Sequence, residues 1–435
     1  MKTAVLRLLI VAVCTVLLFS SCVKPNPPME NEVESLSLAP DEVIRDATVM
    51  AMTEKYLYYV AQFQADAYEG QKATQVRRVN ITTGETSSAC VDSLCTHDTI
   101  ECPCFGARTM APVRIFGDWL CIQTNFTGSL RKIAFNANNS GITRRRILYN
   151  TQTGEWFPIL EDQAGADKGS FELFYDGKYV YAVAYGSSSK NAETGEIYTP
   201  SIIRSINLKT KEEKDIFSHK FQISLAAVSQ GRVYFYETIG DEFYRFYSVT
   251  TEGEDFREES NMKIEPRHVY RNRFYGTSAD NRLLINDVNT GEVSTVDCFI
   301  TQNAIDIANE YLYYMERENL EELYHQMSAY TQEDLKDPIK REESILLEKK
   351  MNSCIAYLWR CNLDGSDPQK ILELGTTFER SIRIVGEYCY LYDYYYDPET
   401  DQFYWGDKQY YESATATPKI CRVHLVTGVK ETLGE

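Results

Sequence analysis

The hydrophobic and polar positions of the chain repeat one pattern along most of its length. Each repeat opens with an apolar and aromatic segment that usually carries tyrosine, and it continues with a segment in which basic and apolar residues alternate. Alternation with a period of two, together with tyrosine and β-branched residues, is typical of strands. The seven opening segments are 55–60, 118–122, 178–182, 232–236, 272–275, 310–314 and 387–391.

A tight turn and a short final strand close each repeat. Glycine, with asparagine and aspartate nearby, supplies the backbone conformations that hairpin turns require. The third turn has lysine in place of glycine and is the weakest member of the series. The turns are Thr83-Gly84-Glu85, Thr153-Gly154-Glu155, Thr210-Lys211-Glu212, Glu252-Gly253-Glu254, Thr290-Gly291-Glu292, Asp364-Gly365-Ser366 and Thr427-Gly428-Val429.

Seven such units predict an all-β fold, a β-propeller of seven blades that covers residues 45–435. Radial repetition of small four-stranded sheets leaves only short sheet edges exposed. A β-solenoid would need a shorter and more regular period, and a pair of β-sandwiches would not repeat one unit seven times. Six or eight blades stay open, because the first and last units could share a blade.

The repeat resembles that of the TolB-like and YWTD-like propellers. In these, a strand such as Tyr-Leu-Tyr-Tyr is followed by one that reads like Ile-Tyr-Arg-Val-Asn-Leu-Asp-Gly. The second strands that match here are 76–80, 203–207 and 358–365, and the resemblance covers nearly all of residues 45–433. It implies an architecture and no single activity, because propellers host binding, scaffolding and several chemistries.

Residues 316–353, inside the sixth repeat, have helical periodicity. Four residues from Leu320 to Met327 recur at the spacing of one helix face. Asp337 and Pro338 then suit the N-cap and the first position of a second helix. We interpret the insertion as an amphipathic hairpin over one face of the propeller, with a lid or a docking surface for a partner as the alternative.

The first 21 residues have the three parts of an export signal: a basic start, an apolar core over residues 8–19 and small residues before Cys22. The core is shorter than the about 20 residues that a membrane-spanning helix needs. The junction resembles the lipobox of bacterial lipoproteins, with Phe19 where leucine is usual. This resemblance implies that Cys22 is lipidated and becomes the mature N-terminus. An ordinary cleaved signal is the alternative.

Residues 22–44 are expected to be a flexible, proline-containing tether behind the lipid. The sequence therefore predicts an extracytoplasmic protein that is anchored to the bacterial cell membrane through its N-terminal lipid. The net charge of −18 becomes two units more negative when Lys2 and Arg7 leave with the signal. Nucleic-acid binders are usually basic, so nucleic acid is excluded as a partner.

The most specific local motif is a cysteine cluster in the first repeat. Cys90, Cys95, His97 and Cys102 form a Cys-x4-Cys-x-His-x4-Cys-Pro element, and Cys104 follows two residues later. The element resembles one in the first blade of uncharacterised propeller lipoproteins of Bacillota, which carries no known activity.

Three states of this cluster are open. Export to an oxidising compartment favours disulfides, and four cysteines allow two local bridges. Three cysteines and a histidine also suit a structural zinc ion, which is the one cofactor that the sequence suggests. Free thiols are the third state.

The other cysteines of residues 45–435 divide into two groups. Cys389 and Cys421 lie on adjacent predicted strands of the last unit, where a cross-strand disulfide is conceivable. The remaining four are expected to be small buried apolar residues. They are Cys121, Cys298, Cys354 and Cys361.

Common catalytic signatures, including metalloprotease, serine-hydrolase and phosphate-loop motifs, do not occur in the chain. Of the five histidines, His424 sits on an alternating strand and is expected to be structural. The acidic residues of 393–401, beside three tyrosines, suit either a solvated loop or a sugar- or cation-binding mouth.

Two functions are therefore compared. The first is a surface-tethered binding or scaffold module for a glycan, peptide or protein partner. The alternative is an exported glycan-active hydrolase or lyase with its site at the central mouth. Several Asp, Glu, His or Arg side chains gathered around the centre would favour the enzyme, and a mouth lined only by Ser, Thr and apolar residues would count against it.

Overall fold

The computed structural model describes most of the repeat region. The described residues are 51–53, 55–65, 71–97, 101–107, 114–126, 143–160, 169–187, 189–190, 197–239, 243–264, 266, 268–300, 304–377, 382–405, 408–409 and 420–433. The predicted signal segment, Cys22 and the predicted tether lie outside these residues, as do residues 127–142.

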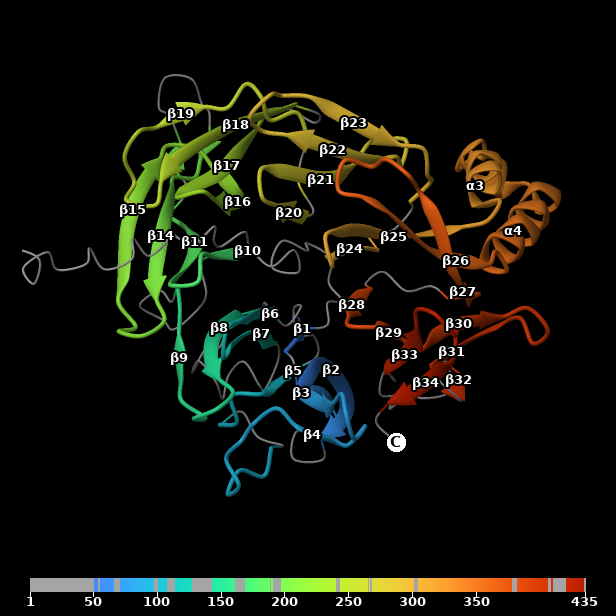
Figure 1. Cartoon of the computed structure of the whole chain (residues 1–435), viewed down its shortest axis with the longest axis horizontal. Coiled ribbons are helices and arrows are strands. Elements are labelled where there is room, and N and C mark those ends of the chain that lie inside the picture. Colours follow the sequence, from blue (N-terminus) through green and yellow to red (C-terminus); the bar gives the residue numbers. More distant parts are fainter. Residues whose placement is uncertain are drawn as a thin grey trace, which may run out of the picture. The chain divides into compact units, whose positions relative to one another are not determined.

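Seven antiparallel sheets surround a common centre in the described part of the chain (Figure 1). Blade one has β1 (Ala51–Met52), β2 (Tyr56–Ala65), β3 (Gln71–Asn80) and β4 (Thr86–Ser88), with β5 (Phe105–Ala107) paired to β3. Blade two has β6 (Arg114–Phe116), β7 (Trp119–Phe126), β8 (Thr143–Asn150) and β9 (Trp156–Pro158). Blade three has β10 (Gly169–Tyr175), β11 (Tyr179–Tyr185), β14 (Ser201–Asn207) and β15 (Glu213–His219), and a side hairpin of β12 (Ser189–Lys190) and β13 (Ile197–Tyr198). Blade four has β16 (Ile223–Ser229), β17 (Arg232–Ile239), β18 (Phe243–Thr250) and β19 (Arg257–Glu258).

The last three blades follow the same order. Blade five has β20 (His268–Tyr270), β21 (Arg273–Thr277), β22 (Leu283–Asp287) and β23 (Val293–Val296). Blade six has β24 (Ile305–Ala308), β25 (Tyr311–Arg317), β26 (Ala356–Asn362) and β27 (Gln369–Gly375). Blade seven has β28 (Arg383–Val385), β29 (Tyr388–Tyr392), β33 (Ile420–His424) and β34 (Lys430–Leu433), and a side sheet of β30 (Tyr394–Asp397), β31 (Gln402–Trp405) and β32 (Lys408–Gln409).

The predicted seven-bladed propeller is confirmed. Each sheet is one contiguous stretch of chain, and blades one and seven share no strand among the described residues, which excludes six or eight blades. The opening segment of each predicted repeat is the second strand of its blade. The innermost strand precedes it, and the repeat pattern did not reveal that strand.

All seven predicted turns join the third and fourth strands of a blade. In blade one, the Asn80 side chain accepts hydrogen bonds from the backbone N–H groups of Thr82 (2.9 Å) and Thr83 (3.1 Å). In blade seven, His424 replaces the asparagine, and its Nδ1 accepts from Val426 and Thr427 (both 3.2 Å). The structural role expected for this histidine is therefore confirmed.

The third turn reaches the same conformation without glycine. Lys211 has φ 63°, against 74° for Gly84 at the equivalent position. The backbone N–H of Lys211 donates to the carbonyl of Asn207 at 2.8 Å, as that of Gly84 does to Asn80 at 2.8 Å. The asparagine and the hydrogen bonds thus set the conformation of this turn. They hold Lys211 in the left-handed region of backbone conformation, which is unfavourable for a residue other than glycine.

Hydrophobic packing between neighbouring sheets forms the core, and it also closes the ring. Leu57 and Tyr59 of blade one pack with Tyr390 and Ile420 of blade seven. Across the same junction, the Arg422 guanidinium donates to the carbonyl of Ile81 at 2.7 Å. Side chains therefore join the two ends of the propeller, where some propellers use a shared strand.

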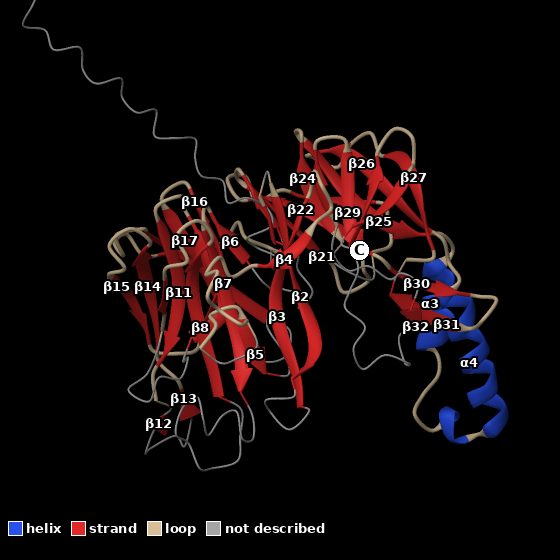
Figure 2. Ribbon diagram, turned by 90° about the horizontal axis from the view of Figure 1, so that it is seen from below, coloured by secondary structure: helices blue, strands red, loops and turns tan. Residues whose placement is uncertain are grey.

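The predicted helical insertion is present between β25 and β26 (Figure 2). It consists of α3 (Leu320–Ser328), the 3₁₀ turn η3 (Asp334–Lys336) and α4 (Pro338–Asn352). The Asp337 side chain accepts from the N–H of Ile339 at 2.9 Å, as expected of an N-cap. The Arg317 guanidinium donates to the carbonyl of Met351 at 2.6 Å and so joins the end of α4 to blade six. Among the described helices, neither is long and apolar enough to cross a membrane.

Gly253 offers a test of how closely adjacent blades approach. Its φ is +89°, and a Cβ atom there would lie 1.8 Å from the carbonyl oxygen of Ile216 in blade three. We expect Gly253→Ala to reduce the free energy of unfolding by about 3 kcal/mol, because backbone must move. Gly84→Ala is the matched control: it has φ +74° and no atom within 4 Å of the added Cβ. It should lose only about 1 kcal/mol. Urea unfolding measures both losses, and equal losses would contradict the expectation.

Candidate functional site

The cysteine cluster lies between β4 and β5, on the side of blade one that faces blade two. The backbone N–H of Val76 in β3 donates to the carbonyl of Cys104 at 2.8 Å. The N–H of Val91 donates to the hydroxyl of Tyr149 in blade two at 2.7 Å. The segment is therefore held by two blades.

Four potential metal ligands converge in this segment. The ligand atoms of Cys90, Cys95, His97 and Cys102 all lie within 4.8 Å of one another. The His97 Nδ1 is 3.9 Å from the Cys102 sulfur. A tetrahedral zinc site with Zn–S bonds of about 2.3 Å has ligand atoms roughly 3.8 Å apart, so a small contraction of this group would suit the ion.

The backbone presents His97 in an uncommon conformation. His97 has φ 64°, in the left-handed region that few non-glycine residues adopt. The Gln75 side-chain amide donates to its carbonyl at 2.9 Å, which helps to hold that conformation. Residues in such strained positions are often found at ligand sites.

Cys104 lies on the buried side of the cluster. It is 0% exposed, whereas Cys95 is half-buried. Hydrogen bonding from Cys104 is the largest influence that lowers the pKa of Cys90, to about 5, and that of Cys102, to about 7. Burial raises the pKa of Cys104 itself and raises that of Cys95 to about 12. Cys104, the fourth cysteine of the cluster, is thus placed to donate a hydrogen bond to the thiolate of Cys90 or of Cys102.

Charge within the cluster also acts on the histidine. Burial lowers the pKa of His97, but the hydrogen bond to Cys102 and the negative charges of Cys90 and Cys102 raise it above its usual value overall. The arrangement therefore favours thiolates beside a positive group, and a metal ion would supply such a charge permanently.

The expected disulfides are not confirmed. Cys90, Cys95, Cys102 and Cys104 are free thiols in the structure. In blade seven, Cys389 pairs with Val423 and Cys421 with Leu391, so the two cysteines are not directly opposite each other. The four cysteines expected to be buried apolar residues are buried: Cys121, Cys298, Cys354 and Cys361.

A ring of equivalent positions on the innermost strands surrounds the centre (Figure 1). Each member is paired with the same position of the next strand, and each is at most 6% exposed. Four members are polar or charged and three are apolar. In chain order they are Ala51, Arg114, Phe174, Ala227, His268, Asp306 and Arg383.

Three of the polar members contact a neighbouring blade. The Arg114 guanidinium donates to the carbonyl of Leu173 at 3.1 Å. The Asp306 carboxylate accepts from the N–H of Ile384 at 2.6 Å and lies 3.6 Å from the Arg383 guanidinium. These contacts hold adjacent blades together.

The acidic group of the last unit is also engaged within the protein. The Asp393 carboxylate accepts from Lys430 and, at 3.1 Å, from Thr432. The Asp401 carboxylate accepts from Tyr396 and forms an ion pair with Lys349 of α4. These contacts give Asp393 and Asp401 structural roles and count against a binding mouth at these two carboxylates.

A cavity of about 570 Å³ opens between the helical insertion and blade six. Its walls combine aromatic rings with carboxylates, and its size suits a small ligand or a side chain. The lining residues are Phe299, Glu316, Arg317, Glu318, Asn319, Leu320, Glu321, Glu322, His325, Tyr357, Trp359 and Lys370. Sequence reasoning missed this site, because its residues are spread over some 70 positions and share no motif. Tyr357 and Trp359, two aromatic residues at alternate positions directly after the insertion, were the available signal.

No protein-family model matches the chain, and no curated protein matches it. Among solved structures, it is similar to an acylaminoacyl peptidase of Pyrococcus horikoshii at 11% identity and TM-score 0.46, over 92% of this chain and 54% of that one. It is similar to the β-propeller domain of the Trilobed protease of Pyrococcus furiosus at 12% identity and TM-score 0.47, over 89% and 95%. It is also similar to a prolyl endopeptidase at 12% identity and TM-score 0.48, over 91% of this chain and 50% of that one. The chain spans about half the length of the two whole peptidases. These likenesses concern the fold.

Proposed function

We propose that this chain is an extracytoplasmic, lipid-anchored β-propeller that serves as a binding or scaffold module for a glycan, peptide or protein partner. The position of Cys22 after an export signal and the resemblance to lipoproteins of Bacillota support the anchoring. The cavity between the helical insertion and blade six is the observation that carries the binding role. Loops and insertions on a rigid scaffold are where binding sites concentrate.

A structural zinc ion in blade one is part of the proposal. Cys90, Cys95, His97 and Cys102 would hold it, because they form a Cys₃His donor set with converging ligand atoms. The ion would staple the long connection between β4 and β5 to the blade. Cys104 would stay a buried thiol behind it.

The anchor is tested by mass spectrometry of the protein from bacterial membranes. We expect a mature chain that begins at a diacylated Cys22 and remains with the membrane fraction after a high-salt wash. Cys22→Ala should prevent lipidation and leave the protein outside the washed membranes. A wild-type chain without lipid would contradict the anchor.

Glycan and peptide arrays probed with the wild-type protein test the binding role, and an absence of any specific ligand would contradict that role.

The zinc ion is tested by elemental analysis of the purified chain. We expect about one zinc per chain, and a chelator should lower the melting temperature. Cys90→Ser and Cys102→Ser should each lose the metal. Cys361→Ala is the matched control, because it removes a buried thiol in blade six and should keep the metal. A metal-free wild-type chain with a disulfide in the cluster would contradict the site.

A glycan-active hydrolase or lyase at the central mouth is the second candidate. The presence of Arg114, His268, Asp306 and Arg383 in the ring of innermost positions favours it. Their burial and the contacts of three of them with neighbouring blades favour a structural role instead. Depolymerisation of a glycan that is retained on the arrays would establish the enzyme.

A further inference from the structure

The cavity beside the helical insertion has an aromatic wall built by β26. Tyr357 and Trp359 are alternate residues of this strand, so their side chains lie on one face of blade six. The Trp359 ring stacks on Tyr314, with centroids 6.3 Å apart and an angle of 6° between the planes. This stacking fixes the orientation of the indole.

A cation of the protein itself already lies on this wall. Lys370 of β27 pairs with Trp359 in the sheet. Its ammonium group lies 3.7 Å from the centroid of the Tyr357 ring and 5.5 Å from that of Trp359. Ammonium groups are attracted to aromatic faces at these distances. The wall is thus shaped to receive a positive charge.

Carboxylates line the rest of the cavity. Glu316 is half-buried, and burial raises its pKa while one of its oxygens accepts from the N–H of Phe299 at 3.0 Å. The Glu318 carboxylate accepts from the Tyr357 hydroxyl at 3.3 Å. With Glu321 and Glu322, four glutamates face one lysine and one arginine in the lining.

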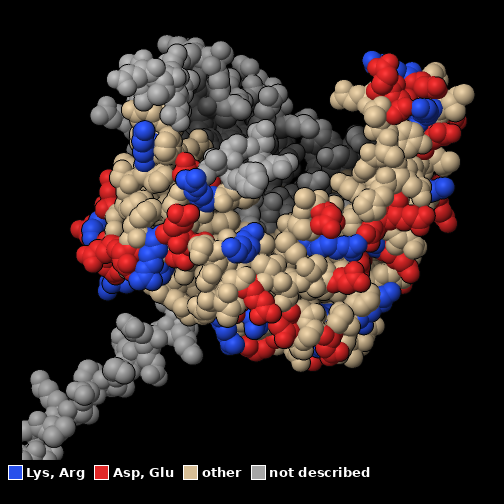
Figure 3. Space-filling model, turned by 90° about the horizontal axis from the view of Figure 1, so that it is seen from above, with Lys and Arg blue, Asp and Glu red and all other residues tan. Residues whose placement is uncertain are grey.

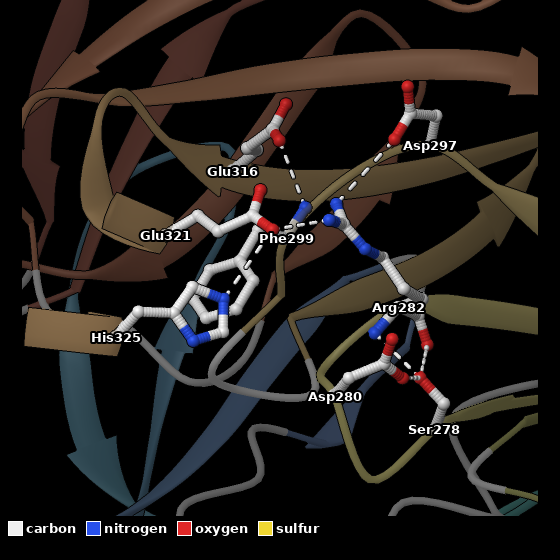
Figure 4. Close-up of polar contacts among 8 residues, drawn as sticks. All are labelled: Ser278, Asp280, Arg282, Asp297, Phe299, Glu316, Glu321 and His325. Carbon is white, nitrogen blue, oxygen red and sulfur yellow. Dashed lines mark hydrogen bonds and ion pairs between the residues drawn. The ribbon is translucent and has the colours of Figure 1, made fainter. Parts of the chain in front are cut away.

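Some charged groups of the lining already contact other parts of the protein. The Arg317 guanidinium donates to the carbonyls of Met351 (2.6 Å) and Asn352 (3.1 Å) at the end of α4. Glu321 lies between Arg282 of blade five and His325 of α3, whose Nε2 is 3.7 Å away (Figure 4). These contacts fix one side of the cavity and hold α3 against blade five.

Figure 3 shows acidic and basic side chains mixed over the visible face, including the projecting insertion, so this face does not carry a single sign of charge. The preference for a ligand therefore arises inside the cavity, from its aromatic wall and its glutamates.

We infer that this cavity binds a ligand that carries an ammonium or guanidinium group on an apolar stem, such as a lysine or arginine side chain of a peptide or a free polyamine. The stem would lie along Trp359 and Phe299, and the charge would lie among Glu316, Glu318 and the aromatic faces. The inference rests on the proposed binding function and names its ligand class. It also gives Lys370 a role, as an internal competitor for the aromatic wall.

The test uses the detergent-solubilised full chain and a fluorescent peptide that contains three lysines among glycine and serine residues. Fluorescence anisotropy should show binding that weakens as salt increases, and an otherwise identical acetyl-lysine peptide should not bind. Spermidine, added as a competitor, distinguishes the sources. Displacement of the peptide at lower concentrations of spermidine than of unlabelled peptide identifies a free polyamine, and the reverse order identifies a peptide side chain.

Three variants assign the binding to this cavity. Glu316→Gln combined with Glu318→Gln should weaken the lysine peptide about tenfold. Trp359→Ala should weaken it as well, because the cation loses its aromatic face. Lys370→Met should strengthen it, because the internal competitor and its repulsion are removed. Glu254→Gln, on an exposed turn of blade four, is the matched control and should bind as the wild type does. Circular dichroism and urea unfolding report whether each variant is folded.

Equal binding of the acetyl-lysine peptide would overturn the inference, and so would weaker binding by Lys370→Met. A neutral glycan that binds at Trp359 while the lysine peptide does not would also overturn it, but would leave the proposed binding function intact. Failure of every ligand class on the arrays would instead contradict the proposed function itself.

Discussion

The structure depends on the need of every sheet to bury both of its faces. A blade of four short strands cannot cover its own apolar side chains, so each blade is stable only between two others. One core cluster joins Phe174 of blade three to Val233 of blade four and Phe274 of blade five. The same packing continues across the junction between blades one and seven. Closure of the ring removes the last exposed pair of faces.

That constraint explains which parts of the fold were visible in the sequence. The second and third strands alternate and end in turns with a strict chemistry, so their repeat was readable. Asn80 and His424 show why the turns recur even where a residue type changes. Each side chain accepts hydrogen bonds from the backbone N–H groups two and three residues further along the chain. Five of the seven innermost strands have only two to four residues, and adjacent residues are buried on both faces, as in Arg383–Val385, so they carry no alternation to detect. Their position follows from ring closure, which is a property of the whole chain.

The candidate sites divide in the same way. The ligands of the cysteine cluster lie within 13 residues of sequence, from Cys90 to Cys102, so their spacing could suggest a site but could not choose between sulfur bridges and a metal. The proposed zinc site rests on what the fold adds to that spacing, which is the convergence of His97 on the sulfurs and the placement of Cys104 behind them. The cavity at the insertion depends on tertiary contacts, because residues as far apart in the sequence as Phe299 and Lys370 line it together only in the folded protein.

The absence of a shared strand between the described parts of blades one and seven has a consequence for how such a chain can change over time. Each blade is one uninterrupted segment that contains all four of its own strands and its own turn. Copying or deleting one segment therefore adds or removes a complete sheet and leaves the others paired. Only the side chains at the junction, such as Arg422 with the Ile81 carbonyl, must then find new partners. In this architecture, the number of blades can therefore change by one complete blade at a time. The contact between the first and last blades limits which numbers allow the ring to close.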